Sequence, residues 1–371
     1  MAQPITIYLP RVARLSLTEI REHANGATVT PEIDSETEWK SVTVSFGDSQ
    51  IKLSNDPEQS RANVMEHISG FQGYIWKCAE GKMTAPLFAL MQRLYLVHQF
   101  IGTVSEPEVT PEIGDFVASI TKKNHCLKFI GDTVFGSDFD PIIGPDTGYV
   151  DGAEMSYWPD SIERRKENRA SLAMIGIKIP ETLNLNASIQ ETILRSPSEV
   201  GLRAVVLYYT AYTAVPNGMP KPQVREYLQS LDEWVSPAEK TFLASSDSDQ
   251  QTTLDMAWRF EALWALLWAL NVHDDLGMGN EPHDVAEMDR LIEEFGGAQA
   301  LIDAKEVRCI EEILEEADMV RCKNWACRDA RGEESGPPAG LHPGVVAEQH
   351  HALNWLIRFE ESEWDDVDTP S

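Results

Sequence analysis

Residues 258–270 read Trp-Arg-Phe-Glu-Ala-Leu-Trp-Ala-Leu-Leu-Trp-Ala-Leu and form the most apolar stretch of this 371-residue chain. Because only Arg259 and Glu261 interrupt its apolar character, the stretch predicts a helix that is buried on nearly all sides. A membrane-spanning helix needs ~20 apolar residues, so we expect no association with a membrane. The stretch therefore predicts the centre of a helical core.

The sequence on both sides of this stretch predicts further helices and almost no strands. Segments 196–199 and 236–239 read Ser-Pro-Ser-Glu and Ser-Pro-Ala-Glu, and each is a capping box with proline at the first helical position. Further helices are expected at about 284–296, 300–330 and 343–360, with a loop over 271–282. We therefore predict an all-α domain over residues 151–371.

Residues 1–150 mix helical and strand patterns and predict an α+β domain. Ser16 and Asp56-Pro57 are expected to start helices, and residues 86–100 to form an apolar one. The economical arrangement is a small mixed sheet with helices on one face. Strands are expected at 5–9, 41–46, 51–53, 127–130 and 133–135, with a hairpin turn at Gly47-Asp48.

One pentapeptide, Val-Thr-Pro-Glu-Ile, occurs twice in this N-terminal half, at 29–33 and 109–113. Repeat architectures show sustained self-similarity, whereas the residues that flank these two copies do not agree. The pentapeptide is therefore a weak sign of internal duplication.

Acidic residues greatly outnumber basic ones. Sixty Asp and Glu against 31 Lys and Arg give a net charge of −29, which excludes a generic binder of nucleic-acid phosphates. The excess is larger after residue 160, with 38 acidic and 19 basic side chains against 22 and 12 before it. Such a surface can steer a basic protein partner toward it, although simple solvation of the surface also explains the composition.

Composition also bears on the compartment and on cofactors. The five cysteines are scattered and odd in number, and the N-terminal Met-Ala-Gln-Pro lacks the pattern of a secretory signal, so we expect a cytoplasmic protein. Cys322 and Cys327 point to different faces of a helix, and no zinc spacing occurs. The chain has no phosphate loop, dinucleotide fingerprint or serine nucleophile elbow. We therefore predict no metal and no cofactor.

Polar and aromatic side chains occupy positions on helices where apolar ones are expected. Along 310–331 an apolar stripe from Ile310 to Ala317 continues into Arg321, Trp325 and Arg328, and Asp318 at its edge could pair with Arg321. Either these groups form structural ion pairs, or they line a pocket for an anion. The full candidate cluster comprises Arg203, Arg259, Glu261, Asp318, Arg321, Trp325, His350, Asn354, Trp364, Asp365 and Asp366.

The last helix and the terminus carry two further predictions. His350 lies inward between Val346 and Leu353, as a hydrogen-bonded core histidine would, whereas His351 and Trp355 are expected to point away. The terminal Trp364-Asp365-Asp366 is expected to fold back and to be anchored by its indole ring.

From about residue 161 to the C-terminus a series of landmarks occurs in order: Arg165, Gly176-Ile177, Arg195-Ser196, Arg203, 258–263, 267–270, Ala317-Asp318, Trp325-Ala326, 352–356 and 364–367. With these landmarks the sequence resembles a bacterial family described only as domain of unknown function 4272. Departures are Gln349 in Glu-Gln-His, where the family has arginine, and the ending Pro370-Ser371, where it has Asp-Thr. The resemblance implies a fold and an intracellular bacterial setting, but no activity.

Two main hypotheses of function remain, and a third, a scaffold or regulatory module of a larger assembly, would show as a large apolar surface patch. The first is a non-enzymatic acidic module that binds a basic protein, as an immunity protein binds a toxin; it rests on the charge of −29 without a recognisable catalytic constellation. The second is an enzyme or small-ligand binder in which Arg259, Glu261, Asp318, Arg321 and His350 surround a pocket. Convergence of these side chains on a cavity would distinguish the second hypothesis from the first.

Overall fold

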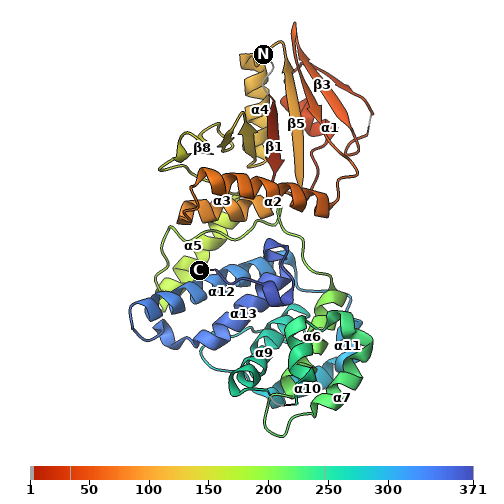
Figure 1. The fold of residues 1–371 in the computed structure, drawn as a ribbon, viewed down its shortest axis with the longest axis vertical. Helices are drawn as coiled ribbons and strands as arrows, with labels where there is room; N and C mark the ends of the chain where they lie inside the picture. Colours follow the sequence, from red (N-terminus) through yellow and green to blue (C-terminus); the bar gives the residue numbers. More distant parts are fainter. Residues whose placement is uncertain (1–3, 34, 247, 371) are drawn as a thin grey trace. The chain divides into compact units, whose positions relative to one another are not determined.

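The computed structural model describes residues 4–33, 35–246 and 248–370. Met1 to Gln3 lie outside the described residues, and they are part of the N-terminal stretch in which we expect no secretory signal. Ser371 also lies outside the described residues. The chain divides into two compact units, one of residues 1–159 with 190–192, the other of residues 160–189 with 193–371. The predicted α+β class is confirmed, since strands occupy the first unit and the second unit is helical (Figure 1).

A single sheet of nine strands, all paired antiparallel, organises the first unit. Its spatial order is β2-β3-β4-β5-β1-β6-β7-β8-β9. The five expected strands are confirmed, as is the turn at Gly47-Asp48 between two of them. The strands are β1 (Ile5–Leu9), β2 (Thr28–Pro31), β3 (Ser41–Phe46), β4 (Ser49–Ser54), β5 (Gln99–Glu106), β6 (Leu127–Ile130), β7 (Thr133–Phe135), β8 (Pro141–Gly144) and β9 (Gly148–Tyr149).

The expectation of a mixed sheet covered on one face is wrong. Ile7 packs in one apolar cluster with α1 and α4, whereas the next residue, Tyr8, packs in another cluster with α2 and α3. Because successive side chains of a strand point to opposite faces, helices cover both faces of the sheet. These helices are α1 (Leu17–His23), α2 (Arg61–Cys78), α3 (Ala85–Tyr95) and α4 (Pro111–Lys123).

Two helix boundaries in this unit differ from the prediction. The helix expected from Asp56-Pro57 begins at Arg61, because Ser60 accepts from the Asn63 amide and forms a capping box with it. The apolar run from Pro86 ends as a helix at Tyr95 and continues from Gln99 as the central strand β5. An apolar run is compatible with either a buried helix or a buried strand, so its periodicity alone could not place this change.

The second unit is all-α, and its core surrounds α9. This helix spans Gln250–Ala269 and includes the apolar stretch, and it packs against α6 and α13 (Figure 1). Both capping boxes are confirmed, at Ser196 and Ser236. The α-helices are α5 (Pro159–Met174), α6 (Pro197–Tyr212), α7 (Lys221–Tyr227), α8 (Pro237–Ala244), α9, α10 (Val285–Phe295), α11 (Gly297–Ile302), α12 (Ile310–Gly332) and α13 (Pro343–Leu356).

Short 3₁₀ helices and one break complete this unit. The helix expected over 300–330 is two helices, because residues 303–309 separate α11 from α12. The helix expected over 343–360 ends at Leu356, after which Arg358 adopts a left-handed conformation (φ 53°) that ends the helical run. No helix within the described residues is both long enough and apolar enough to cross a membrane. The 3₁₀ helices are η1 (Leu228–Trp234), η2 (Pro338–Gly340), η3 (Phe359–Glu361) and η4 (Trp364–Asp366).

Candidate functional site

Trp364 in η4 is the anchor of the C-terminal segment, as the sequence predicts. Its side chain is 4% exposed and packs edge-on against His351 and Trp355, with ring centroids 4.6 and 5.4 Å away. The guanidinium of Arg203 lies 4.5 Å from the centre of the indole ring. The expectation that His351 and Trp355 point away from the core is wrong, because the returning segment covers both side chains.

Arg203 on α6 is buried, and both of its terminal nitrogens have partners. It donates to the carbonyl of Trp234 (2.8 Å) and forms a buried ion pair with Glu239 on α8. The other carboxylate oxygen of Glu239 accepts the Ser236 amide (2.9 Å) and caps its own helix. The pair leaves Arg203 with its charge compensated inside the protein.

Two further candidates hold the C-terminal segment by the backbone. Asp365 accepts the Ala238 amide at the start of α8 (2.8 Å), where the positive end of the helix favours a carboxylate. Asn354 on α13 donates to the carbonyl of Asp368 (2.8 Å). Asp366 is exposed. These contacts are those of a docked terminus rather than of a reactive centre.

Asp318 and Arg321, which we expected to pair within one helix, each have a partner far away in sequence. Asp318 receives the Nε and Nη2 atoms of Arg165 on α5, at 3.0 and 2.7 Å, and the amide of Asn168 at 3.1 Å. Arg321 donates to the side-chain oxygen of Asn186 (2.8 Å). Tertiary packing, of α12 against α5 for Asp318 and against the loop that holds Asn186 for Arg321, therefore decides these partners, and the i,i+3 spacing does not.

Glu261 and His283 form a carboxylate–imidazole pair at the core of the unit. Glu261 accepts both from Nδ1 of His283 (2.7 Å) and from its backbone amide (2.9 Å). The ring of Trp264 is stacked between those of His283 and His273, with centroids 4.1 and 3.8 Å apart. Such a pair can orient a histidine for proton transfer, provided that a substrate can reach it.

Arg259 pairs with Glu348 on α13 (3.0 Å) beside this pair. Burial raises the pKa of Glu348, the charge of Arg259 opposes that shift, and the nearby carboxylate of Glu261 adds to it. Glu348 is the residue before Gln349, where the family pattern has an arginine. The two α9 candidates are thus each bound to a residue outside α9.

His350 lies inward on α13, as expected, but it is not the hydrogen-bonded histidine that we predicted. Its side chain is fully buried, and neither ring nitrogen has a hydrogen-bond partner within the described residues. Burial first, and then the charges of Arg321 and Arg328, lower the pKa of His350 well below its usual value, so the ring is neutral. Trp325 is half-buried and packs against the main apolar cluster.

Comparison with known protein families decides the affiliation of the second unit. The model of the family described as domain of unknown function (DUF4272) matches residues 164–367, which is more than half of the chain. The chain belongs to the DUF4272 family. No curated protein and no solved structure matches it. The matched residues run from the start of the Arg165–Asp318 contact to the docked segment around Trp364.

Partners of the candidates in the DUF4272 region were not predicted, although signals for them exist. The capping box at Ser236 accounts for only one carboxylate oxygen of Glu239, so the second oxygen is available for another partner. Along α5 the buried residues recur at helical spacing and are mostly polar, so this face must meet polar partners. They are Ser161, Arg164, Arg165, Asn168 and Leu172.

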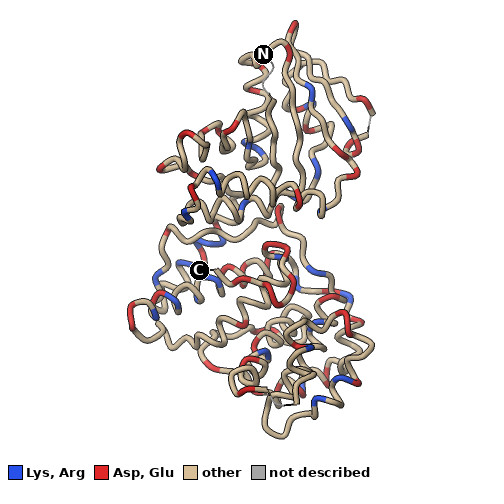
Figure 2. The backbone as a smooth tube through the Cα atoms, in the orientation of Figure 1, with Lys and Arg blue, Asp and Glu red and all other residues tan. Residues whose placement is uncertain are grey.

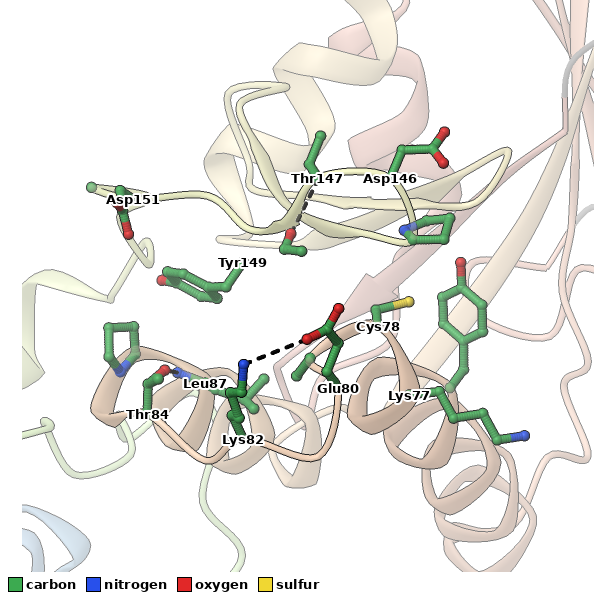
Figure 3. Close-up of a pocket in the computed structure, with 16 residues that line it drawn as sticks. Lys77, Cys78, Glu80, Lys82, Thr84, Leu87, Asp146, Thr147, Tyr149 and Asp151 are labelled. Carbon is green, nitrogen blue, oxygen red and sulfur yellow. Dashed lines mark hydrogen bonds and ion pairs between the residues drawn. The ribbon is translucent and has the colours of Figure 1, made fainter.

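None of the four cavities described in the structure is lined by any of the eleven candidate residues. The largest, about 940 Å³, lies in the first unit between the α2–α3 turn and the β8–β9 hairpin (Figure 3). In it, Lys82 is already paired with Glu80 (3.5 Å). Among the described residues, no three His, Cys, Asp or Glu side chains are grouped so as to hold a metal. The candidates therefore form several closed contacts and not one pocket.

Proposed function

We propose that this chain is a non-enzymatic, cytoplasmic bacterial protein that binds a basic protein partner through its acidic surface, as an immunity protein binds a toxin. The observation that carries the proposal is the net charge of −29. Buried pairs such as Arg165–Asp318 and Arg203–Glu239 are each neutral overall, so the whole excess of carboxylates remains among the other residues of the chain. Figure 2 shows acidic residues along both units.

One acidic cluster in the helical unit is a suitable contact surface for such a partner. Arg308 lies between the carboxylates of Asp274 (3.5 Å) and Glu312 (4.0 Å). Burial raises the pKa of Glu316, and Lys323 opposes this shift. The nearby carboxylates of Glu315 and Asp275 raise the pKa further. These five carboxylates exceed the two cations beside them, so a cationic partner would relieve their mutual repulsion.

The enzyme hypothesis has less support, because the side chains that it requires do not converge. Arg259, Glu261, Asp318 and Arg321 each contact a different partner, and none of them lines a described cavity. A catalytic constellation needs space for the substrate between its members.

The test is capture of a partner by the tagged full chain from a lysate of the source cells, at two salt concentrations. Raising the salt from about 0.1 M to about 1 M shortens the screening length from ~10 Å to ~3 Å, so we expect a basic protein to be retained at low salt and released at high salt. The variant Asp274→Asn/Asp275→Asn/Glu312→Gln/Glu315→Gln should then bind the purified partner at least about tenfold more weakly, mainly through slower association.

A matched control removes the same number of charges elsewhere. The variant Asp48→Asn/Glu66→Gln/Glu108→Gln/Asp115→Asn changes exposed acidic residues of the first unit, and it should bind like the unmodified chain. A partner that is retained equally at both salt concentrations, or equally by both variants, would contradict the proposal; so would the absence of any retained basic protein.

A further inference from the structure

A cavity of about 500 Å³ lies within the helical unit, between the C-terminal part of α12 and the beginning of α13. Asn324, Arg328 and Arg331 line it from α12, and Pro343 and Ala347 line it from α13. Its volume lies in the range of small-molecule sites. We call this cavity the arginine pocket.

The two arginines of the arginine pocket lack an acidic partner. Arg328 is exposed and donates one long hydrogen bond, to the hydroxyl of Thr369 (3.4 Å). Arg331 is exposed, and its side chain makes no hydrogen bond or ion pair within the described residues. Glu334 also lines the cavity, so the ionised groups of the lining leave one positive charge.

Several other arginines of the same unit differ in this respect. In Arg165, Arg203 and Arg259 a guanidinium nitrogen lies no more than 3.0 Å from a carboxylate oxygen. In a chain with almost twice as many acidic as basic residues, two neighbouring arginines without a carboxylate partner are unexpected. Their free donors can take both oxygens of an anionic group.

Two further polar side chains, Arg321 and His350, lie in the interior next to the arginine pocket, on the two helices that line it. Arg321 lies on the same face of α12, one and two turns before Asn324 and Arg328, and its side chain is buried. His350 follows Ala347 by one turn on α13, and both of its buried ring nitrogens lack a partner within the described residues. The buried imidazole is neutral, as described above, so it adds no charge beside the pocket.

Apart from Ser335, whose hydroxyl donates to the carbonyl of Ala330 (3.1 Å), the remaining walls are apolar and define the body of the ligand. Pro337, Pro343 and Ala347 present carbon atoms to the cavity, and the buried Cys327 closes it. Burial raises the pKa of Cys327 to about 11, so its thiol stays neutral and adds no charge. A fully hydrated ion would leave these walls unused, whereas an anion with a short apolar chain would cover them.

We propose that the arginine pocket binds a small organic anion, with its carboxylate or phosphate group held by Arg328 and Arg331 and its apolar part against Pro337, Pro343 and Ala347. This inference is independent of the proposed protein partner, because the acidic cluster around Arg308 shares no residue with the pocket.

The experiment titrates the full chain with hexanoate and with hexyl phosphate by isothermal calorimetry. Acetate and inorganic phosphate serve as probes of the anionic group alone, and hexanol as the probe of the apolar part alone. We expect hexanoate or hexyl phosphate to bind at least about tenfold more tightly than any of these three, because both halves of the site contribute. Whichever of the two binds more tightly identifies the anionic group.

The variant Arg328→Gln/Arg331→Gln should lose about tenfold or more of this affinity, with its thermal unfolding unchanged because both side chains are exposed. Its matched control is Lys178→Gln/Arg290→Gln, which removes two exposed cations elsewhere in the unit and should bind like the unmodified chain. Equal binding by both variants, binding of acetate or phosphate as tight as that of the longer probes, or no binding of either long probe would each overturn the proposal.

Discussion

At the scale of the residue, the helical unit keeps its charges inside by pairing them. The Arg203 guanidinium and Glu239 carboxylate are both 2% exposed, and the indole of Trp364 covers the guanidinium. A buried ion of this kind costs several kcal/mol of desolvation unless its partner is present, so each member of the pair depends on the other.

Glu239→Gln keeps the helix cap, since glutamine also serves in a capping box, but it removes the charge that compensates Arg203. We expect the free energy of unfolding to fall by about 3–5 kcal/mol in urea titrations. Glu163→Gln, which disrupts an exposed pair with Lys166, is the control and should cost less than about 1 kcal/mol. A loss below about 1 kcal/mol in Glu239→Gln would mean that the buried pair does not form.

His351 makes stability depend on pH. Burial first, and then the charges of Arg259 and Arg203, lower its pKa to about 3, from an ordinary value of 6.5. Between about pH 6.5 and pH 3, His351 is therefore protonated in the unfolded chain and neutral in the folded chain. The free energy of unfolding falls as the pH drops through this range. Between pH 7 and pH 5 this histidine should remove about 2 kcal/mol. Urea titrations of His351→Gln should show a correspondingly smaller loss over that interval, and an identical loss would contradict the assignment.

The starts of helices could be predicted at this scale, whereas the partners of buried charges could not. Ser196 and Ser236 act through residues three positions away, so the local sequence contains the whole interaction. Asp318 meets Arg165 across 153 positions. A helical wheel identifies which face is buried, but not which helix covers that face.

At the scale of the element, the same sequence takes different structures in different surroundings. The pentapeptide Val-Thr-Pro-Glu-Ile contributes Val29 to strand β2, whereas its second copy caps helix α4 through Thr110 and starts it at Pro111. The first copy pairs with β3, and the second has an apolar face that packs on the sheet. Tertiary contacts thus override local preference, which is why the repeat predicted nothing about the fold.

The C-terminal segment is held by the buried indole of Trp364 together with several polar contacts. Trp364→Ala removes the indole that contacts His351, Trp355 and Arg203, so we expect about 3–5 kcal/mol of destabilisation. Hydrogen exchange should also show faster exchange of residues 359–370 than of α9. Trp76→Ala, at a ring that is 40% exposed in the first unit, is the control. Unchanged exchange in the terminal segment would show that other contacts hold it.

At the scale of the whole molecule, the order of the chain and the division into units do not coincide. Residues 190–192 belong to the first unit, although they lie within the stretch matched by the DUF4272 family. Glu191 in this segment forms a buried ion pair with Arg93 on α3, and the Val12 amide donates to the carbonyl of Gln190 (2.8 Å). A sequence pattern read along the chain has no means of assigning three residues to a distant unit.

We therefore expect Glu191→Gln to destabilise the first unit, although residue 191 lies within the stretch matched by the DUF4272 family. With the charge opposite Arg93 removed, we expect hydrogen exchange in α3 and β5 to accelerate by about tenfold or more, while α9 and α13 stay protected. Faster exchange in α9 with an unchanged α3 would contradict the assignment of this segment.

Charged residues on the helices of the DUF4272 region bind one another in the interior, as Arg165 and Asp318 do. A double-mutant cycle on Arg165 and Asp318 tests this claim most directly, with Arg165→Met, Asp318→Asn and their combination compared in urea titrations. We predict a coupling free energy of about 2 kcal/mol or more, because either single change leaves a buried charge without its partner, whereas the double change removes both charges. Free energies of unfolding that simply add, with a coupling below about 0.5 kcal/mol, would contradict the claim.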